Sequence, residues 1–231
     1  MAGRFVYAWP RPAVAVDAVV FGVLLGPSPS LEVLLIRRGL APFAGRWALP
    51  GGFVGEDEDL EVAARRELAE ETGLSGFYLE QLATYGRPGR DPRGHTVSVA
   101  WLALVRRLDH VPVGGTDARE AAWFPVEALP PLAFDHGEIL AAGRERLRRR
   151  LRYSPIGFEL LPPQFTLGEL QALVELIDGA PADKRNFRRK VEASGVLVDT
   201  GLHRRGPQRP ARLFSFDRAR YDALEGRGFD L

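Results

Sequence analysis

The hydrophobic positions in the first half of the chain fall into runs that predict strands. Residues 13–25, 31–37 and 96–105 are rich in β-branched residues and leucine, which favours buried strands. The first two runs are separated by GPSPS, a sequence typical of a turn or short loop. We therefore expect a hairpin near the N-terminus and a further strand downstream.

Two segments of the same half have helical periodicity. Within residues 57–72 apolar side chains recur every four residues, and Gly73 follows where a helix commonly ends in a left-handed conformation. Residues 137–151 are also helical in pattern, and the cationic sequence RERLRRRLR at their end suits the negative pole of a helix dipole. We expect those arginines to form a solvated face. The alternating elements predict an α/β fold.

The remainder of the chain predicts a smaller second unit. Thr166 and Glu169 have capping-box spacing before an apolar stripe, which predicts a helix over residues 166–177. Asp183 can cap a second, cationic helix after a short turn. Two strands, GVLVDT and ARLFSFD, follow on either side of a basic loop. Helix, turn, helix and basic hairpin together predict a winged helix-turn-helix.

The length of 231 residues suits one medium domain and one small domain, each with its own core. Three prolines interrupt the pattern in residues 152–165, so we divide the chain into domains 1–151 and 152–231. No apolar run approaches the roughly 18 residues of a membrane span, and the N-terminus lacks the apolar core of a signal peptide. We expect a cytoplasmic protein that does not enter a membrane.

The charge is unevenly distributed, although the formal net charge is only +1. Residues 181–212 contain nine cations and three anions, a local charge of +6 that leaves the rest of the chain at −5. Such a surface can neutralise DNA phosphates while a helix reads base edges. We expect the following residues to contact DNA: Lys184, Arg185, Asn186, Arg188, Arg189, Lys190, Arg204, Arg205 and Arg209.

Two other interpretations of this basic region remain open. It could be a solvated surface or a docking patch for a protein partner, because basic runs are common on protein surfaces. RNA binding is disfavoured, since no aromatic residues are interleaved with the charges to stack on bases.

Three glutamates are spaced to share one face of the first helix. Glu67, Glu70 and Glu71 stand at i, i+3 and i+4, which brings their carboxylates close together and makes them repel unless cations lie between them. The chain has no cysteine, so oxygen atoms and four histidines are the available metal ligands. Carboxylate oxygens favour Mg²⁺ or Mn²⁺. An ordinary glutamate-rich solvent face is the alternative interpretation.

The wider pattern resembles the Nudix box, in which a loop, helix and loop bind metal-chelated diphosphates. Gly52, Glu58 and the sequence RELAEETGL, which begins at Arg66, match its fixed positions. The resemblance implies an α/β/α sandwich with a mixed sheet, and metal-assisted attack of water on a phosphoryl group. It also implies that Glu67, Glu70, Glu71 and the carbonyl of Gly51 hold the metal. Glu58 and Arg66 would complete the catalytic set by supporting those carboxylates.

Further ligand contacts are predicted outside the box. Arg46 and Trp47 could hold a phosphate and stack on a base, although Trp47 is as readily explained as a core residue. Arg90 and Arg93 could reach a second phosphate from a loop. Glu120 is a weak candidate for an additional catalytic base. The histidines match no metal-ligand spacing, so we interpret His95, His110 and His136 as surface or hydrogen-bonded residues.

The two halves together resemble the Nudix-related transcriptional regulators of bacterial NAD metabolism. The resemblance covers nearly the whole chain through LPPQFTLGELQALVELI, DKRNFRRKV and RPARLFSFD. It implies a homodimer that senses ADP-ribose or a related nucleotide and represses genes of NAD synthesis or salvage from a palindromic operator. Because every residue of the Nudix box is present, an active ADP-ribose or nucleoside-diphosphate-sugar pyrophosphatase with an accessory C-terminal domain remains the alternative.

Overall fold

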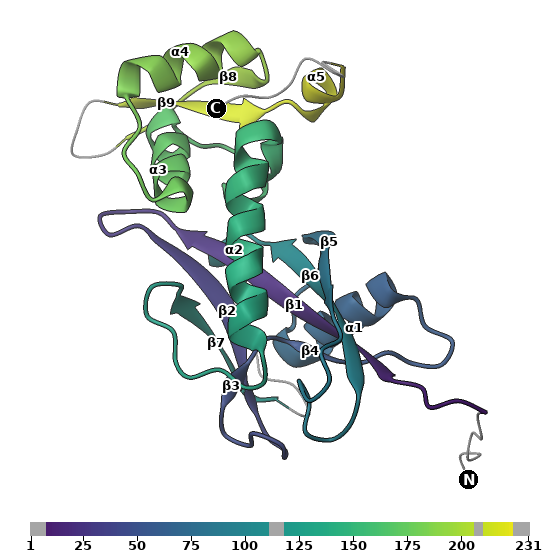
Figure 1. The fold of residues 1–231 in the computed structure, drawn as a ribbon. Helices are drawn as coiled ribbons and strands as arrows, with labels where there is room; N and C mark the ends of the chain where they lie inside the picture. The colour runs from purple at the N-terminus through teal and green to yellow at the C-terminus, as the bar shows by residue number, and fades with distance from the viewer. Residues whose placement is uncertain (1–7, 111–117, 206–209, 224–231) are drawn as a thin grey trace.

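The computed structural model describes residues 8–110, 118–205 and 210–223. Figure 1 shows a sheet at one end of the molecule, a smaller helical unit at the other and one long helix, α2, running from the first to the second. None of the described helices is long and apolar enough to cross a membrane.

Among the described residues, seven strands form one mixed sheet in the order β3-β2-β1-β6-β5, with β4 paired to β1 and β7 paired to β2. The strands are β1 (Ala13–Leu24), β2 (Ser30–Arg38), β3 (Trp47–Ala48), β4 (Gly51–Phe53), β5 (Tyr78–Tyr85), β6 (Thr96–Leu104) and β7 (Ala118–Pro125). Two helices cover the sheet, α1 (Leu60–Thr72) and α2 (His136–Tyr153). β1 and β6 are parallel and the other pairs are antiparallel, so the predicted mixed sheet and hairpin are confirmed.

The alternation of side chains along β1 explains the two helical layers. Ala18 and Val20 belong to the cluster that packs beneath α1, whereas Val19 and Phe21 belong to the cluster beneath α2. Successive residues of a strand point to opposite faces, so a continuous apolar strand requires a cover on both sides. Burying each large side chain stabilises the fold by about 1.5–3 kcal/mol.

Capping residues set the ends of α1. The carboxylate of Asp59 accepts a hydrogen bond from the backbone N–H of Glu61 at 2.9 Å, and Gly73 ends the helix with φ of 74°. The helix therefore begins at Leu60, three residues later than the periodicity predicts, because the preceding acidic residues form its approach and cap.

The C-terminal unit is a winged helix-turn-helix, as predicted. Its elements are η2 (Pro155–Leu160), α3 (Leu167–Asp178), α4 (Lys184–Ser194), β8 (Leu197–Arg204), β9 (Ala211–Phe216) and α5 (Arg218–Ala223). Both predicted caps are present. Thr166 and Glu169 exchange hydrogen bonds in a capping box, and the carboxylate of Asp183 accepts from the N–H of Asn186 at 2.7 Å.

The expectation of two separate cores is wrong. Phe21 of the sheet, Leu151 of α2, Phe158 of η2 and Leu173 of α3 belong to one continuous apolar cluster. A Cβ on Gly157 would lie 2.4 Å from Leu151 Cδ1, so η2 packs directly against the end of α2. The proline-containing segment that suggested a domain boundary is thus largely buried, and the two units are packed together rather than merely linked.

The arginines at the end of α2 are not simply a solvated face. Arg148 and Arg152 lie 3.5 and 3.3 Å from Asp178, at the C-terminal end of α3. Arg146 and Arg150 lie 3.5 and 3.0 Å from Glu80 on β5. These ion pairs connect α2 to both units, which sequence periodicity could not reveal because the acidic partners are distant in the chain.

We predict that Gly51→Ala destabilises the protein far more than Gly89→Ala. Both glycines have positive φ, 154° and 81°, but a Cβ on Gly51 would lie 2.1 Å from the carbonyl oxygen of Val16, whereas nothing lies within 4 Å of a Cβ on Gly89. Overpacking and strain together should lower the free energy of unfolding by at least about 3 kcal/mol for Gly51→Ala, against about 1–2 kcal/mol for the control. Equal losses in urea denaturation would contradict the close β1–β4 packing.

Candidate functional site

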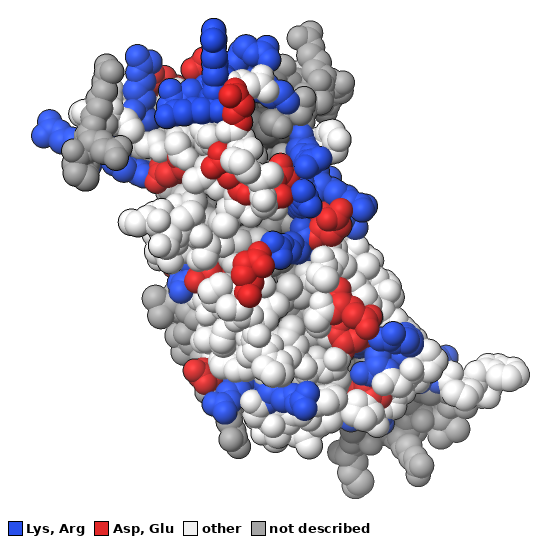
Figure 2. All heavy atoms as spheres, turned by 60° about the vertical axis from the view of Figure 1, so that its left-hand side comes forward, with Lys and Arg blue, Asp and Glu red and all other residues white. Residues whose placement is uncertain are grey.

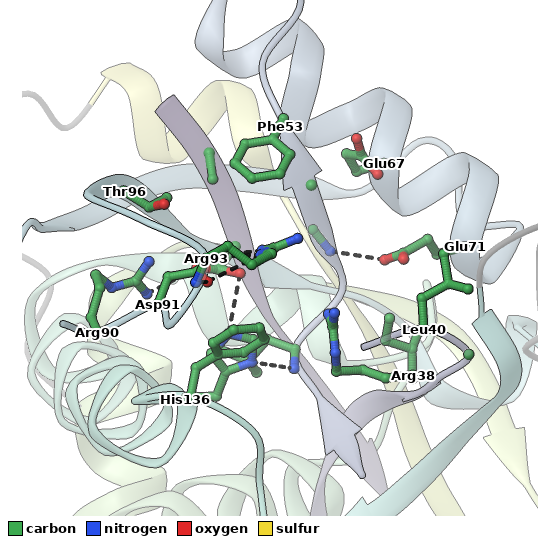
Figure 3. Close-up of a pocket in the computed structure, with 18 of the residues that line it drawn as sticks. Arg38, Leu40, Phe53, Glu67, Glu71, Arg90, Asp91, Arg93, Thr96 and His136 are labelled. Atoms are coloured by element: carbon green, nitrogen blue, oxygen red, sulfur yellow. Dashed lines mark hydrogen bonds and ion pairs between the residues drawn. The ribbon is translucent and has the colours of Figure 1, made fainter. Parts of the chain in front are cut away.

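A cavity of about 260 Å³ opens where β1, β4 and α1 meet the loop before β6 and the start of α2. Figure 3 shows Glu67 and Glu71 on one side of it and Arg90, Asp91 and Arg93 on the other. The cavity therefore offers carboxylates for a cation and guanidinium groups for an anion, a combination suited to a metal-bound phosphate ligand.

Glu71 is the most deeply buried carboxylate of the predicted metal set. Its Oε2 accepts a hydrogen bond from the N–H of Gly51 at 2.8 Å, and the residue is 8% exposed. Burial raises the pKa of Glu71 to about 8, and the charge on Glu67 adds to the shift. Burial also raises the pKa of Glu67, despite a hydrogen bond from Arg66. Both groups would be stabilised in their ionised form by a nearby cation.

Arg66 lies among the other carboxylates of the Nudix box. Its guanidinium makes a bidentate contact with Glu58 at 2.7 and 2.8 Å and donates to Glu67 at 2.7 Å and Glu70 at 3.3 Å. The hydrogen bonds from Arg66 and from the N–H of Gly55 lower the pKa of Glu58 to about 2. Glu58 thus fixes Arg66, and Arg66 in turn orients two predicted metal ligands.

The residues present fit a divalent cation in chemistry, although they are not yet arranged around one. No group of three or more His, Asp or Glu side chains in the described ranges is already in a metal-binding arrangement. Glu67 nevertheless lies against β4, which carries the predicted carbonyl ligand, since a Cβ on Gly52 would lie 2.3 Å from the Oε1 of Glu67. A buried and a half-buried carboxylate with raised pKa values, close together, are a favourable site for a hard cation.

Arg38 is a cavity residue that the sequence did not single out. Its guanidinium carbon lies 4.8 Å from the ring centre of Phe134, and that of Arg93 lies 5.7 Å from the same ring and 4.9 Å from Phe53. Burial lowers the pKa of Arg38, and electrostatic repulsion by Arg93 lowers it further. An anionic ligand group would relieve that repulsion. The only sequence signal was the position of Arg38 at the end of a predicted strand.

Arg90 lines the cavity but is already engaged by protein groups. Its side chain is 4% exposed, contacts Asp135 at 2.7 and 2.9 Å and lies 3.4 Å from Asp17. His136 is also hydrogen-bonded, as predicted. Its Nδ1 accepts from the N–H of Leu49 at 2.8 Å, and burial lowers its pKa, so the ring is neutral with Nε2 facing Asp17.

Three other sequence candidates do not line the cavity. Arg46 is exposed beside the ring of Phe43, and Trp47 packs edge-on against Phe124, in agreement with its interpretation as a core residue. Glu120 lies 3.7 Å from Arg37 on the neighbouring strand. Ligand contact by Arg46 and Trp47 stays a prediction.

The predicted DNA contacts of α4 lie together on one exposed surface. Lys184, Arg185, Arg188 and Arg189 line a shallow depression with Glu192, while the apolar side of the helix faces the core. Figure 2 shows Lys and Arg gathered at the winged-helix end of the molecule. Arg188 also lines a groove that runs to the wing, where His203, Arg205 and Arg212 are found.

Some members of the predicted DNA set have other contacts. The guanidinium of Arg204 pairs with Glu169 and donates to the carbonyl of Gln164 at 3.2 Å, which ties the wing to α3. Arg189 donates to the side-chain oxygen of Asn186 at 2.7 Å. Lys190 is half-buried and has a partner of its own. Arg209 lies outside the described residues.

Similarity to known proteins follows the same two-part organisation. Residues 13–143 match the NUDIX domain, and residues 157–216 match the NrtR DNA-binding winged helix domain. The chain is 38% identical to the ADPR responsive transcriptional repressor NtrR of Acinetobacter baylyi, over 93% of this chain and 86% of that protein.

Two solved structures from Shewanella oneidensis extend the comparison. NrtR in complex with a 27mer DNA matches with a TM-score of 0.78 and 38% identity, over 90% of this chain and 95% of that one. The NUDIX domain of NrtR in complex with ADP ribose matches with a TM-score of 0.55 and 39% identity, over 61% and 91%. Since both domains match in this order and the similarity spans nearly the full chain, the protein belongs to the NrtR family of Nudix-related transcriptional regulators.

Proposed function

We propose that this protein is a DNA-binding transcriptional repressor whose Nudix domain binds ADP-ribose or a related nucleotide and thereby controls DNA binding. One observation carries the proposal. A cavity lined by carboxylates and arginines and an exposed cationic helix, α4, lie in one chain whose two units share an apolar core. The similarity to an ADPR-responsive repressor over most of the chain supports the same combination.

The residues that line the cavity favour a nucleoside diphosphate over an uncharged ligand. Arg38 and Arg93 are close enough to repel each other and can share one anionic group, while the rings of Phe53 and Phe134 offer surfaces on which a planar or sugar ring can pack. ADP-ribose carries two phosphates and three ring systems, so it matches both kinds of contact. As a breakdown product of NAD, it would suit control of genes for NAD synthesis or salvage.

The predicted metal ligands would hold Mg²⁺ or Mn²⁺ beside the phosphates. Glu67, Glu70, Glu71 and the carbonyl of Gly51 are the residues concerned, and the cation would neutralise phosphate charge when bound. Arg66 and Glu58 keep Glu67 and Glu70 oriented toward that position. Hydrolysis of the ligand is a second candidate activity, favoured by the complete carboxylate set, in which case the repressor would also consume its own signal.

A homodimer on a palindromic site is the form in which we expect the winged helices to act. Two recognition helices must be about 34–36 Å apart to enter successive turns of the major groove, so a small rotation of each protomer is enough to weaken both contacts. Such a regulator would work in the cytoplasm, where the chromosome and NAD metabolism are both accessible in bacteria.

The proposal is tested with a duplex that the full-length protein selects from a randomised pool. We predict that ADP-ribose changes the affinity for this duplex by about 5- to 150-fold, the usual range of allosteric coupling, with release as the expected direction. Fluorescence anisotropy with labelled duplex measures the change, and AMP serves as the control nucleotide. Failure to select any sequence, or an affinity independent of ADP-ribose, would contradict the repressor function.

The DNA-binding surface predicts two distinguishable defects. Arg185→Ala should cost about 1–3 kcal/mol of binding to the selected duplex, because an exposed α4 arginine can read base edges. Arg205→Ala on the wing should weaken all sequences alike and reduce the salt slope by about one.

Arg218→Ala is the matched control for these variants, since Arg218 is an exposed arginine of the same unit that pairs with Asp222 on α5. It should leave DNA affinity unchanged. If Arg185→Ala bound the selected duplex as tightly as the parent at every salt concentration, α4 would be a solvated helix rather than a recognition helix.

The buried carboxylate of Glu71 predicts a pH-dependent stability in metal-free protein. The pKa of Glu71 is about 8 in the folded state and 4.5 in the unfolded state. Between these two pH values the folded state keeps a proton that the unfolded state has lost, so the free energy of unfolding falls as pH rises. Glu71→Gln removes the cost of burying an ionised carboxylate and keeps an oxygen that can accept the hydrogen bond from Gly51. The variant should gain roughly 2–4 kcal/mol relative to the parent between pH 5 and pH 9.

Thermal unfolding in EDTA measures this difference, and Glu56→Gln serves as the exposed control. Added Mg²⁺ should stabilise the parent at pH 9 but not Glu71→Gln, which should also lose any Mg²⁺-dependent hydrolysis of ADP-ribose. If the parent and Glu71→Gln had parallel profiles of stability against pH, or were stabilised equally by Mg²⁺, Glu71 would not be a metal ligand.

A further inference from the structure

A buried ion pair connects Arg90, which lines the cavity, to Asp135, the residue immediately before α2. The side chains of Arg90 and Asp135 are 4% and 6% exposed, and their two contacts of 2.7 and 2.9 Å form a bidentate pair. Removing two charges from water is costly, and an apolar pair of similar size is often at least as stabilising. Stability alone therefore does not account for a pair at this position, and its geometry indicates a positioning role.

Asp135 occupies the N-cap position of α2 but does not cap the helix. Its side chain makes no hydrogen bond to the backbone N–H groups of the first turn, and both carboxylate oxygens accept from Arg90. An N-cap aspartate normally stabilises its helix through this capping hydrogen bond, which is absent here. The carboxylate thus fixes the helix to the loop between β5 and β6, which carries Arg90.

The same loop supplies cavity residues that would meet a ligand. Asp91 accepts from Arg93 at 2.7 and 3.0 Å, and the guanidinium of Arg93 lies over Phe53 and Phe134. Phe134 directly precedes Asp135 and has φ of 51°, a left-handed conformation that a bulky residue seldom adopts. An anion that drew Arg93 away from these rings would therefore alter the contacts of both the loop and the residue that leads into α2.

The far end of α2 contacts the winged helix through half-exposed ion pairs and close apolar packing. Arg148 and Arg152 both reach Asp178 at the C-terminal end of α3. Leu151 packs against Gly157 so closely that no side chain fits between them. In the middle, Gly143 lies against Val19 of the sheet, with 3.0 Å between its hypothetical Cβ and the valine. A tilt of α2 at its first turn would consequently move α3.

From this geometry we propose that Arg90 is a positioning residue which, through Asp135 and α2, transmits occupancy of the cavity to the winged helix. The inference rests on the proposed function and identifies how its two sites communicate. Arg90 need not contact the ligand, since its guanidinium is engaged by Asp135 and Asp17. Breaking the pair should separate ligand binding from its effect on DNA.

Asp135→Asn is the decisive variant, because it keeps the size and capping ability of the residue but removes the charge that holds Arg90. Asp135 does not line the cavity. We expect ADP-ribose affinity within about threefold of the parent, whereas the 5- to 150-fold effect of ADP-ribose on binding of the selected duplex should fall below about threefold. Calorimetry measures the first quantity and anisotropy measures the second.

Glu138→Gln is the matched control. Glu138 lies on the first turn of the same helix and pairs with Arg87 from the same loop at 3.0 Å, but both side chains are more than 60% exposed. An exposed pair contributes little, so this variant should respond to ADP-ribose as the parent does.

Asp178→Asn tests the opposite end of α2, and it replaces Asp135→Asn in the experiment if that variant does not fold. It should also uncouple DNA binding from ADP-ribose, and hydrogen exchange should show that ADP-ribose changes protection of α3 in the parent but not in the variant. If ADP-ribose changed the DNA affinity of the parent and of both variants equally, the positioning role alone would be overturned. If ADP-ribose did not change the DNA affinity of the parent, both this role and the proposed function would be overturned.

Discussion

The packing of α2 against both the sheet and the winged helix is the interaction on which the rest of the structure depends. Leu147 and Leu151 are buried in the same apolar cluster as Phe21 of β1 and Leu173 of α3. That cluster is continuous across the two units, so the burial of apolar surface that stabilises the fold also fixes their relative position. A flexible linker would have left each unit to move independently.

Electrostatics at the two ends of α2 serve different purposes. At its start, buried charges converge on the cavity, where carboxylates with raised pKa values and neighbouring guanidinium groups leave unfavourable interactions that a metal-bound phosphate would relieve. At its end, half-exposed arginines pair with Asp178 and add orientation more than stability. The charges that face DNA lie beyond both, on α4, where solvent keeps them available.

Local sequence rules predicted much of the fold. The capping box at Thr166, the cap at Asp183 and the apolar runs of β1, β2 and β6 depend on neighbours within a few residues, and all are present. The short strands β3 and β4 were missed because two or three residues carry no periodicity. β5 was missed because its burial alternates only weakly, and β7 was missed because its partner β2 is distant in the chain.

The candidate site was predictable where a motif fixes it and obscure where tertiary contacts assemble it. The glutamates of the Nudix box lie on one helix face, so their spacing was sufficient. Arg38 and Phe134 reach the same cavity from positions 96 residues apart, and no local pattern could associate them. Arg90 lines the cavity, but its engagement by Asp135, 45 residues later in the chain, could not be read from a local pattern.

The central claim is that the cavity and the winged helix form one thermodynamic system. The most direct test is calorimetric titration of a non-hydrolysable methylene analogue of ADP-ribose into the protein alone and into its complex with the selected duplex. Linkage requires the duplex to change the affinity for the analogue by the same factor, about 5- to 150-fold, by which the analogue changes affinity for the duplex. Equal affinities in the presence and absence of DNA would contradict the account.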